Sequence, residues 1–131
     1  MKSYLKPNKI KHFRVGQKET NSILTGFRTG HTNLNSSRFS IGQIDDPSCL
    51  CHFPNETSEH FLLDCFLYSA ERQNLFSLAA YLIPNFMVLN RKEKYNILTK
   101  GINLLNPDFY HTNLRISLAV QNFILKTKRF S

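Results

Sequence analysis

The sequence predicts a small, mainly α-helical protein, and three observations support this fold class. Apolar residues recur at helical spacing in several stretches, and residues typical of helix starts precede those stretches. No stretch of useful length alternates between apolar and polar residues, as a half-buried strand would. With 131 residues, of which 41% are hydrophobic, the chain is long enough to bury a core of its own.

Three segments divide the chain. Residues 1–19 are polar and lysine-rich, and we expect them to form a flexible, basic N-terminal arm. Residues 20–84 hold a first helix and a cysteine-rich region, and residues 85–131 hold a pair of helices. The first helix is expected from Thr20 to near Gly30, because glycine is common where a helix stops.

The longest helix is expected over residues 57–82. Thr57 offers a side chain that can cap its start, and Glu59 lies in the first turn, where the helix dipole favours an acid. Apolar residues then keep a helical period as far as Pro84. A strong turn signal, Asp45-Asp46-Pro47-Ser48, comes before this region.

Two further helices are expected over about 91–105 and 107–126. Asn90 and Glu93 have the spacing of a capping box for the first of them. Asn106-Pro107-Asp108 starts the second with a cap, a proline at the first helical position and an acid next. We expect this pair to pack antiparallel across a short loop.

The net charge of +8 is unevenly distributed along the chain. Residues 1–43 carry eight Lys/Arg and one Glu, and residues 72–131 carry nine Lys/Arg and two acids. The segment between them, residues 44–71, carries six acids and no Lys or Arg. Two basic arms therefore flank an acidic centre, which is typical of proteins that bind a polyanion such as nucleic acid, although solvated surface lysines would give the same count.

The sequence indicates an intracellular protein of the nucleus or cytoplasm, with no membrane association. It has no run of about 18 apolar residues, and its first residues lack the apolar stretch of a secretory signal. Its three cysteines do not suit a disulfide framework, because an odd count in a reducing compartment favours metal ligands or free thiols. A disulfide such as Cys49–Cys65 would leave one thiol over.

All three cysteines lie in the acidic centre, in the pattern C-x-C followed by H-x4-C. The candidate ligands are Cys49, Cys51, His60 and Cys65. Three thiolates and an imidazole match a closed tetrahedral Zn²⁺ site. His60 and Cys65 would point about 140° apart on an ideal α-helix, so the helix breaks or bends near Cys65, or one of the two is not a ligand.

Two alternatives to this ligand set remain open at the level of sequence. Cys65 could be a small buried residue of the helix face, with Cys49 and Cys51 free in a loop. His52 could replace His60 as the ligand, although it follows Cys51 directly and would strain a shared site.

A series of motifs surrounds the candidate ligands, namely Arg28-Thr29-Gly30-His31, Leu34, Phe39, Cys49-x-Cys51 and Glu56-Thr57-x-x-His60-x4-Cys65-x-x-Tyr68-x-x-x-Arg72. With these motifs, the cysteine-rich region resembles the C-terminal region of non-LTR (LINE-type) retrotransposon reverse transcriptases. The resemblance covers about residues 20–75, and it implies a CCHC zinc knuckle with Cys49, Cys51, His60 and Cys65 as ligands. His52 departs from the family, which usually has glycine there.

The same resemblance implies a non-catalytic fragment or remnant of a larger polyprotein. The chain has no Asp pair in a strand context, no acidic set of a ribonuclease H site and no Gly-rich phosphate loop. A Cys65–His60 nucleophile pair would lack an oxyanion hole and a third group. We therefore expect no enzymatic activity.

Two functions follow as hypotheses. In the first, the protein binds RNA or single-stranded DNA. The basic candidates for phosphate contacts are Lys9, Lys11, Arg14, Lys18, Arg28 and Arg38. Phe27 could stack on bases, but core packing is the preferred role for its ring. In the second, zinc staples a helical structural or protein-interaction domain that contacts the remainder of a parent polyprotein and no nucleic acid.

Overall fold

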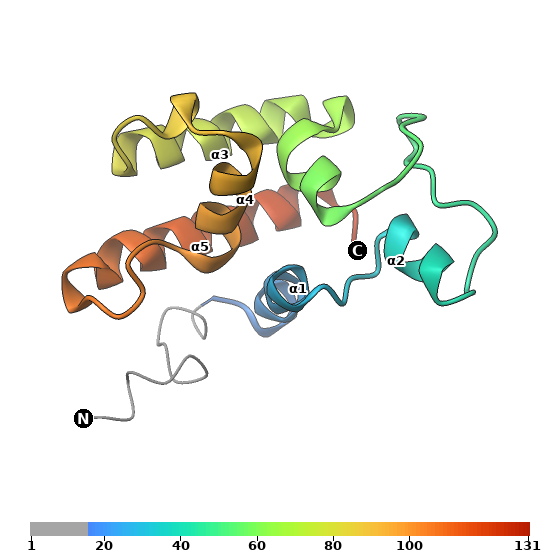
Figure 1. Ribbon diagram of the computed structural model, residues 1–131, viewed down its shortest axis with the longest axis horizontal. Coiled ribbons are helices and arrows are strands. Elements are labelled where there is room, and N and C mark those ends of the chain that lie inside the picture. Colours follow the sequence, from blue (N-terminus) through green and yellow to red (C-terminus); the bar gives the residue numbers. More distant parts are fainter. Residues whose placement is uncertain (1–15) are drawn as a thin grey trace.

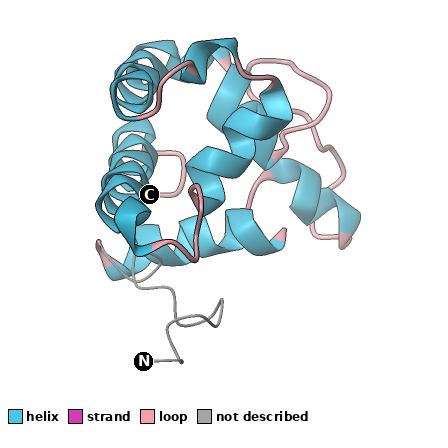
Figure 2. Cartoon of the chain, turned by 60° about the vertical axis from the view of Figure 1, so that its left-hand side comes forward, coloured by secondary structure: helices cyan, strands magenta, loops and turns pink. Residues whose placement is uncertain are grey.

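The computed structural model describes residues 16–131, and the predicted arm residues Lys9, Lys11 and Arg14 lie outside that range. The described chain is built from helices and loops, and residues 16–131 contain no strand (Figure 2), which confirms the predicted class. Its α-helices are α1 (Lys18–Thr29), α2 (Asn35–Ser40), α3 (Ser69–Leu82), α4 (Arg91–Lys100) and α5 (Tyr110–Thr127). Four short helical turns complete it, namely η4 (His60–Asp64), η5 (Phe66–Tyr68), η6 (Phe86–Val88) and η7 (Pro107–Phe109). None of the described helices is long and apolar enough to cross a membrane.

Helices α3 and α5 form the main layer of the fold. They lie side by side and run in opposite directions (Figure 1), and α1 packs against both α5 and α4. A cluster of aromatic rings fills the core between these helices. The ring of Phe61 makes edge-to-face contacts with Phe27, Tyr68, Phe123 and Phe130, with centroids 5.3–5.8 Å apart. Phe27 is 3% exposed, so its predicted role in the core is confirmed.

Helix α1 closely follows the prediction, and two glycines shape its end. Gly30 has φ 85° and ends the helix in the left-handed conformation that glycine adopts at little cost. Gly26 permits a close approach, because a Cβ atom there would lie 2.3 Å from the carbonyl oxygen of His31. The chain can therefore fold back tightly after α1 towards α2.

The single helix predicted over 57–82 is wrong. Residues 60–64 form a π-helical turn, Cys65 leaves the helix with ψ 121°, and α3 begins only at Ser69. The longest helix is instead α5, with 18 residues. Apolar periodicity continues through the break because both halves of the segment face the same core, so the pattern alone does not reveal the interruption.

The C-terminal helices differ from the prediction at their junction. The capping box of Asn90 and Glu93 is present, but α4 ends at Lys100, five residues before the predicted end. Gly101 has φ 90°, and the side chain of Asn113 pairs with the backbone N–H and C=O of Ile102 at 2.8 Å each. This pairing replaces the helical hydrogen bonds of Ile102. In Figure 1, α4 crosses α5 and does not lie antiparallel along it, although the two helices are in contact.

Candidate metal centre

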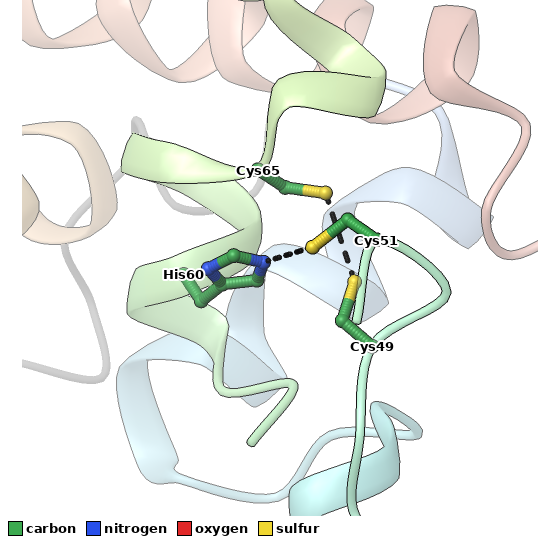
Figure 3. A group of neighbouring side chains, drawn as sticks. All are labelled: Cys49, Cys51, His60 and Cys65. Atoms are coloured by element: carbon green, nitrogen blue, oxygen red, sulfur yellow. Dashed lines mark hydrogen bonds between the residues drawn. The ribbon is translucent and has the colours of Figure 1, made fainter. Parts of the chain in front are cut away.

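The structure brings Cys49, Cys51, His60 and Cys65 together in one cluster (Figure 3). Their sulfur and nitrogen atoms all lie within 4.8 Å of one another. The Sγ atoms of Cys49 and Cys65 are 3.6 Å apart, and the Sγ atom of Cys51 is 3.2 Å from Nε2 of His60. All three cysteines are free thiols, and Cys49, Cys65 and His60 are buried. The cluster joins the loop before η4 to the two ends of η4.

The π-helical turn η4 explains how two residues five positions apart share one site. The backbone N–H of Cys65 donates to the carbonyl of His60 at 2.8 Å, which closes a turn between residues i and i+5. This wider turn returns Cys65 to the side of the helix that His60 occupies. The start of the helix is fixed by Thr57, whose hydroxyl accepts a hydrogen bond from the backbone N–H of His60 at 3.0 Å, as the predicted cap requires.

A tight turn places the two cysteines of the C-x-C pair. The backbone N–H of His52 donates to the carbonyl of Cys49, and the N–H of Cys49 donates to the carbonyl of Phe53, both at 2.9 Å. His52 has φ 76°, a left-handed conformation that favours glycine. Its side chain is exposed and outside the cluster of four ligand atoms. The need for this backbone conformation explains why glycine suits the position.

The geometry of the cluster fits a tetrahedral zinc ion. Bonds of about 2.3 Å to sulfur and 2.0–2.1 Å to nitrogen place the three sulfurs and one nitrogen of a regular tetrahedron roughly 3.5–3.8 Å apart. The distances of 3.6 Å between Cys49 and Cys65, and of 3.2 Å between Cys51 and His60, lie close to that range. Thiolate and imidazole ligands are also those that zinc prefers. The four ligand atoms all lie within 4.8 Å of one another, so the widest pairs need to close by up to about 1 Å for these side chains to hold Zn²⁺.

Burial sets the protonation of the metal-free cluster. It raises the pKa of the Cys49 thiol to about 12 and also raises the pKa of the Cys65 thiol. Burial lowers the pKa of His60, which favours the neutral imidazole that a metal requires. Cys51 differs, because burial raises the pKa of its thiol less than hydrogen bonds of the Phe53 backbone and of Cys49 and Cys65 lower it. The thiols of Cys49 and Cys65 and the imidazole are therefore neutral until a cation stabilises the thiolates.

The ring of Phe53 covers the imidazole of His60. The two rings are stacked, with centroids 4.4 Å apart and an interplanar angle of 6°. The imidazole is held with Nε2 towards the cysteines, while its buried Nδ1 has no hydrogen-bond partner among the described residues. At most metal sites a hydrogen bond to the second ring nitrogen orients the histidine ligand. Here the stacked ring of Phe53 provides part of that orientation.

Glu56 is a buried carboxylate that ties the cluster to the C-terminus. It is 2% exposed, and Arg129 donates to its two oxygens from Nε at 2.8 Å and from Nη2 at 2.6 Å. The same carboxylate accepts from the backbone N–H of Asn35 at 2.8 Å and lies 4.0 Å from Sγ of Cys49. Sequence reasoning missed this role, because nothing in a single sequence pairs residue 56 with residue 129.

Arg72 holds the π-helical turn from the other side. Its buried guanidinium donates to the backbone carbonyls of Phe61, Leu62 and Cys65 at 2.8, 3.0 and 2.7 Å. These contacts satisfy carbonyl groups that the interrupted helix leaves without intrahelical partners. The motif that carries the family resemblance includes Arg72, but the sequence alone assigned the residue no role.

The described basic candidates for phosphate contacts have different environments. Lys18 is exposed at the start of α1, and Arg38 in α2 is partly buried, with its Nε 3.4 Å from Oε1 of Gln43. Arg28 donates from Nε to the carbonyl of Thr99, and burial lowers its pKa to about 10. Arg28 therefore joins α1 to the end of α4, which leaves Lys18 and Arg38 as the more accessible of the three.

Comparisons of the chain with protein-family models, with curated proteins and with solved structures find no significant match. The assignment of the site therefore rests on the geometry and chemistry of the cluster.

Proposed function

We propose that this protein binds one structural Zn²⁺ through Cys49, Cys51, His60 and Cys65. The observation that carries the proposal is that the four ligand atoms lie within 4.8 Å of one another. Cys49 and Cys51 come from a loop, and the π-helical turn places His60 and Cys65 on the same side to meet them. Four protein ligands leave no open position for substrate, so the metal would stabilise the fold and activate no water. Zinc would supply the positive charge that keeps the buried thiols ionised.

We further propose that the zinc-stapled domain binds RNA or single-stranded DNA, as a non-catalytic C-terminal piece of a retrotransposon reverse transcriptase. Two features of the sequence support this proposal. The residues around Cys49–Cys65 resemble that family, and the first 43 residues carry eight cationic side chains and one acid. Such a charge density favours contacts with phosphates in a sequence-tolerant mode.

The proposal is tested by titrating the full, zinc-loaded chain with oligo(dT) and oligo(U) at several salt concentrations. Replacing Lys9, Lys11, Arg14 and Lys18 together by glutamine should weaken binding broadly and flatten its salt dependence. A matched control removes four other cationic charges, with glutamine at Lys92, Arg115, Lys126 and Lys128, and should have a smaller effect. Absence of association at low salt, or equal loss in both variants, would contradict the nucleic-acid function and leave the metal site standing.

A second candidate function is protein interaction without nucleic acid. The observation that favours it is the exposure of several large apolar side chains close to the metal ligands. A chain that holds zinc but binds no oligonucleotide would leave this alternative as the candidate function.

A further inference from the structure

Cys49 and Cys65 face each other inside the cluster of metal ligands. Their Sγ atoms are 3.6 Å apart, about 1.5 Å more than the length of a disulfide bond. In Figure 3 the side chain of Cys65 points toward Cys49, whereas the side chain of Cys51 points toward His60. A short approach of two sulfur atoms is therefore enough to join the loop of Cys49 covalently to the residue that ends η4.

Backbone hydrogen bonds hold both cysteines in this arrangement. The N–H of Cys65 donates to the carbonyl of His60 at 2.8 Å, and the carbonyl of Cys65 accepts from the buried guanidinium of Arg72 at 2.7 Å. The N–H of Cys49 donates to the carbonyl of Phe53 at 2.9 Å. Because the folded chain orients the two thiols, each has a high effective concentration with respect to the other.

Cys51 is the cysteine that solvent reaches. Cys49 is 5% exposed and Cys65 is 0% exposed, whereas Cys51 is only partly buried. Oxidation of cysteine follows exposure and thiolate character, so a small oxidant meets Cys51 first. Cys51 is also the thiol that a disulfide between the other two leaves over. One cysteine can thus receive the oxidant while a neighbouring cysteine resolves the product.

We propose that the cluster is a reversible oxidation site for peroxides. Cys51 reacts first, Cys49 and Cys65 end as a disulfide, and the chain releases its zinc. This inference rests on the proposed zinc site and goes beyond it, because it gives the three cysteines a second role that depends on oxidation. Loss of Cys49 and Cys65 as ligands leaves only Cys51 and His60, where a structural zinc site has four ligands.

The oxidation proceeds through a sulfenic acid at Cys51. Its thiolate attacks one oxygen of hydrogen peroxide, the O–O bond breaks, and the leaving hydroxide takes up a proton to become water. The thiolate of Cys49 or Cys65 then attacks the sulfenic sulfur, and the second oxygen leaves as water in the same way. The other buried thiolate attacks its buried partner and expels the Cys51 thiolate. Two cysteines lose two electrons in total, and one peroxide is reduced to two waters.

The disulfide replaces a crosslink that zinc provides in the reduced chain. It joins residues 16 positions apart, and closing such a loop stabilises a fold mainly by restricting the unfolded chain. We therefore expect the oxidised, zinc-free chain to retain more helicity than the reduced, zinc-free chain. Equal helicity of the two would contradict this part of the proposal.

The test treats the full, zinc-loaded chain with one equivalent of hydrogen peroxide and then alkylates the remaining thiols. Released zinc is measured with a chromogenic chelator. We expect one zinc to be released for each disulfide formed, and zinc binding to return after reduction with dithiothreitol. Retention of zinc by the oxidised chain, or sulfinic acid as the main product, would overturn the proposal.

Peptide mapping identifies the bond that forms. Trypsin keeps all three cysteines in one peptide, residues 39–72, and cleavage after Glu56 then separates Cys65 from the other two. The alkyl label is expected on Cys51 alone, with a disulfide between Cys49 and Cys65. A label on either buried cysteine, or a disulfide between two chains, would overturn the proposal.

A trap for sulfenic acid tests which cysteine reacts first. Dimedone present during the peroxide treatment is expected to label Cys51, because the other two thiols are buried. A label mainly on Cys49 or Cys65 would contradict the assigned order of reaction. This measurement uses the unmutated chain, so it does not depend on how a variant folds.

Two matched serine variants test the choice of pair. Cys51→Ser and Cys49→Ser each remove one thiol and one zinc ligand, but only Cys51→Ser keeps the pair Cys49 and Cys65. In glutathione buffers, Cys51→Ser should form its intramolecular disulfide at a ratio of reduced to oxidised glutathione about tenfold higher than Cys49→Ser requires. Equal ratios, or the reverse order, would overturn the pairing.

Failure of this proposal is distinguishable from failure of the zinc site. A folded chain that holds no zinc as purified contradicts the metal proposal, and peroxide should still join Cys49 to Cys65 in it, because the fold orients the pair. A chain that holds one zinc and forms no disulfide under peroxide leaves the metal site standing and overturns the oxidation site.

Discussion

His52 illustrates how one backbone angle decides which histidine belongs to the cluster. Its φ of 76° continues the turn after Cys51 and leaves the side chain exposed, while Nε2 of His60 lies 3.2 Å from Sγ of Cys51. The sequence left both histidines open as ligands. It could not decide between them, because the turn direction depends on hydrogen bonds of Cys49 with residues 52 and 53 that no local pattern encodes.

Replacement of His52 by glycine should therefore keep the zinc stoichiometry of the protein. Glycine removes the left-handed strain but increases the entropy of the unfolded chain, so the free energy of unfolding should change by less than about 1 kcal/mol. His60→Gln should instead lose stoichiometric zinc. Metal analysis and urea unfolding of both variants check this. Loss of zinc in the His52→Gly variant would show that His52, and not His60, is the zinc ligand.

The protonation of the cysteines predicts how zinc affinity depends on pH. In the metal-free protein the pKa values of Cys49 and Cys65 are raised, so both thiols are protonated at neutral pH and must lose their protons when zinc binds. His60 is already neutral, because burial lowers its pKa. Zinc affinity should rise with pH, and calorimetry in buffers of different ionisation enthalpy should detect proton release. Binding without proton release would contradict thiolate ligation.

At the scale of elements, the interrupted segment 57–82 depends on a contact that lies outside its own pattern. The sequence predicted the cap at Thr57 and the apolar face. It also indicated that the helix could break near Cys65, because His60 and Cys65 would point about 140° apart on an ideal α-helix. It did not predict the π-helical turn, because that geometry is stabilised by Arg72, whose three carbonyl contacts form only in the folded chain. The early end of α4 has a similar cause in Asn113.

Arg72→Met should therefore destabilise the protein strongly. The change keeps an apolar stem but leaves three buried carbonyl groups without their donors, which costs about 3 kcal/mol in total. Zinc affinity should fall as well, because Cys65 loses the contact that fixes its carbonyl. Gln73→Met, at an exposed neighbouring position, serves as the control. Urea unfolding with excess zinc measures both variants, and equal stability of the two would refute this role of Arg72.

Over the whole molecule, one buried ion pair links the cluster to the last residues of the chain. Glu56 and Arg129 are 73 positions apart, and their side chains are 2% and 19% exposed. The helical period of the apolar residues predicted the helical class, and the clustering of cysteines and histidine in the sequence predicted the four candidate ligands, since both are local signals. Neither could predict this pair, because long-range contacts depend on how α5 packs against the rest of the fold.

Glu56→Gln should lower the free energy of unfolding by about 3 kcal/mol, because it leaves the Arg129 guanidinium partly buried and without its carboxylate. Arg91→Gln is the matched control. It removes a surface cation, 54% exposed, that pairs with Glu59 and Asp64, and should cost less than about 1 kcal/mol. Thermal or urea unfolding ranks the two, and the reverse order would contradict a structural role for the buried pair.

The metal content of the protein tests the central claim most directly. The full chain is purified without chelator, and its zinc is measured alongside helicity before and after treatment with a strong chelator. We predict one zinc per chain, its loss in Cys65→Ser, and a cooperative loss of helicity when the metal is removed. A protein that folds cooperatively without metal and keeps its helicity in the chelator would contradict the account.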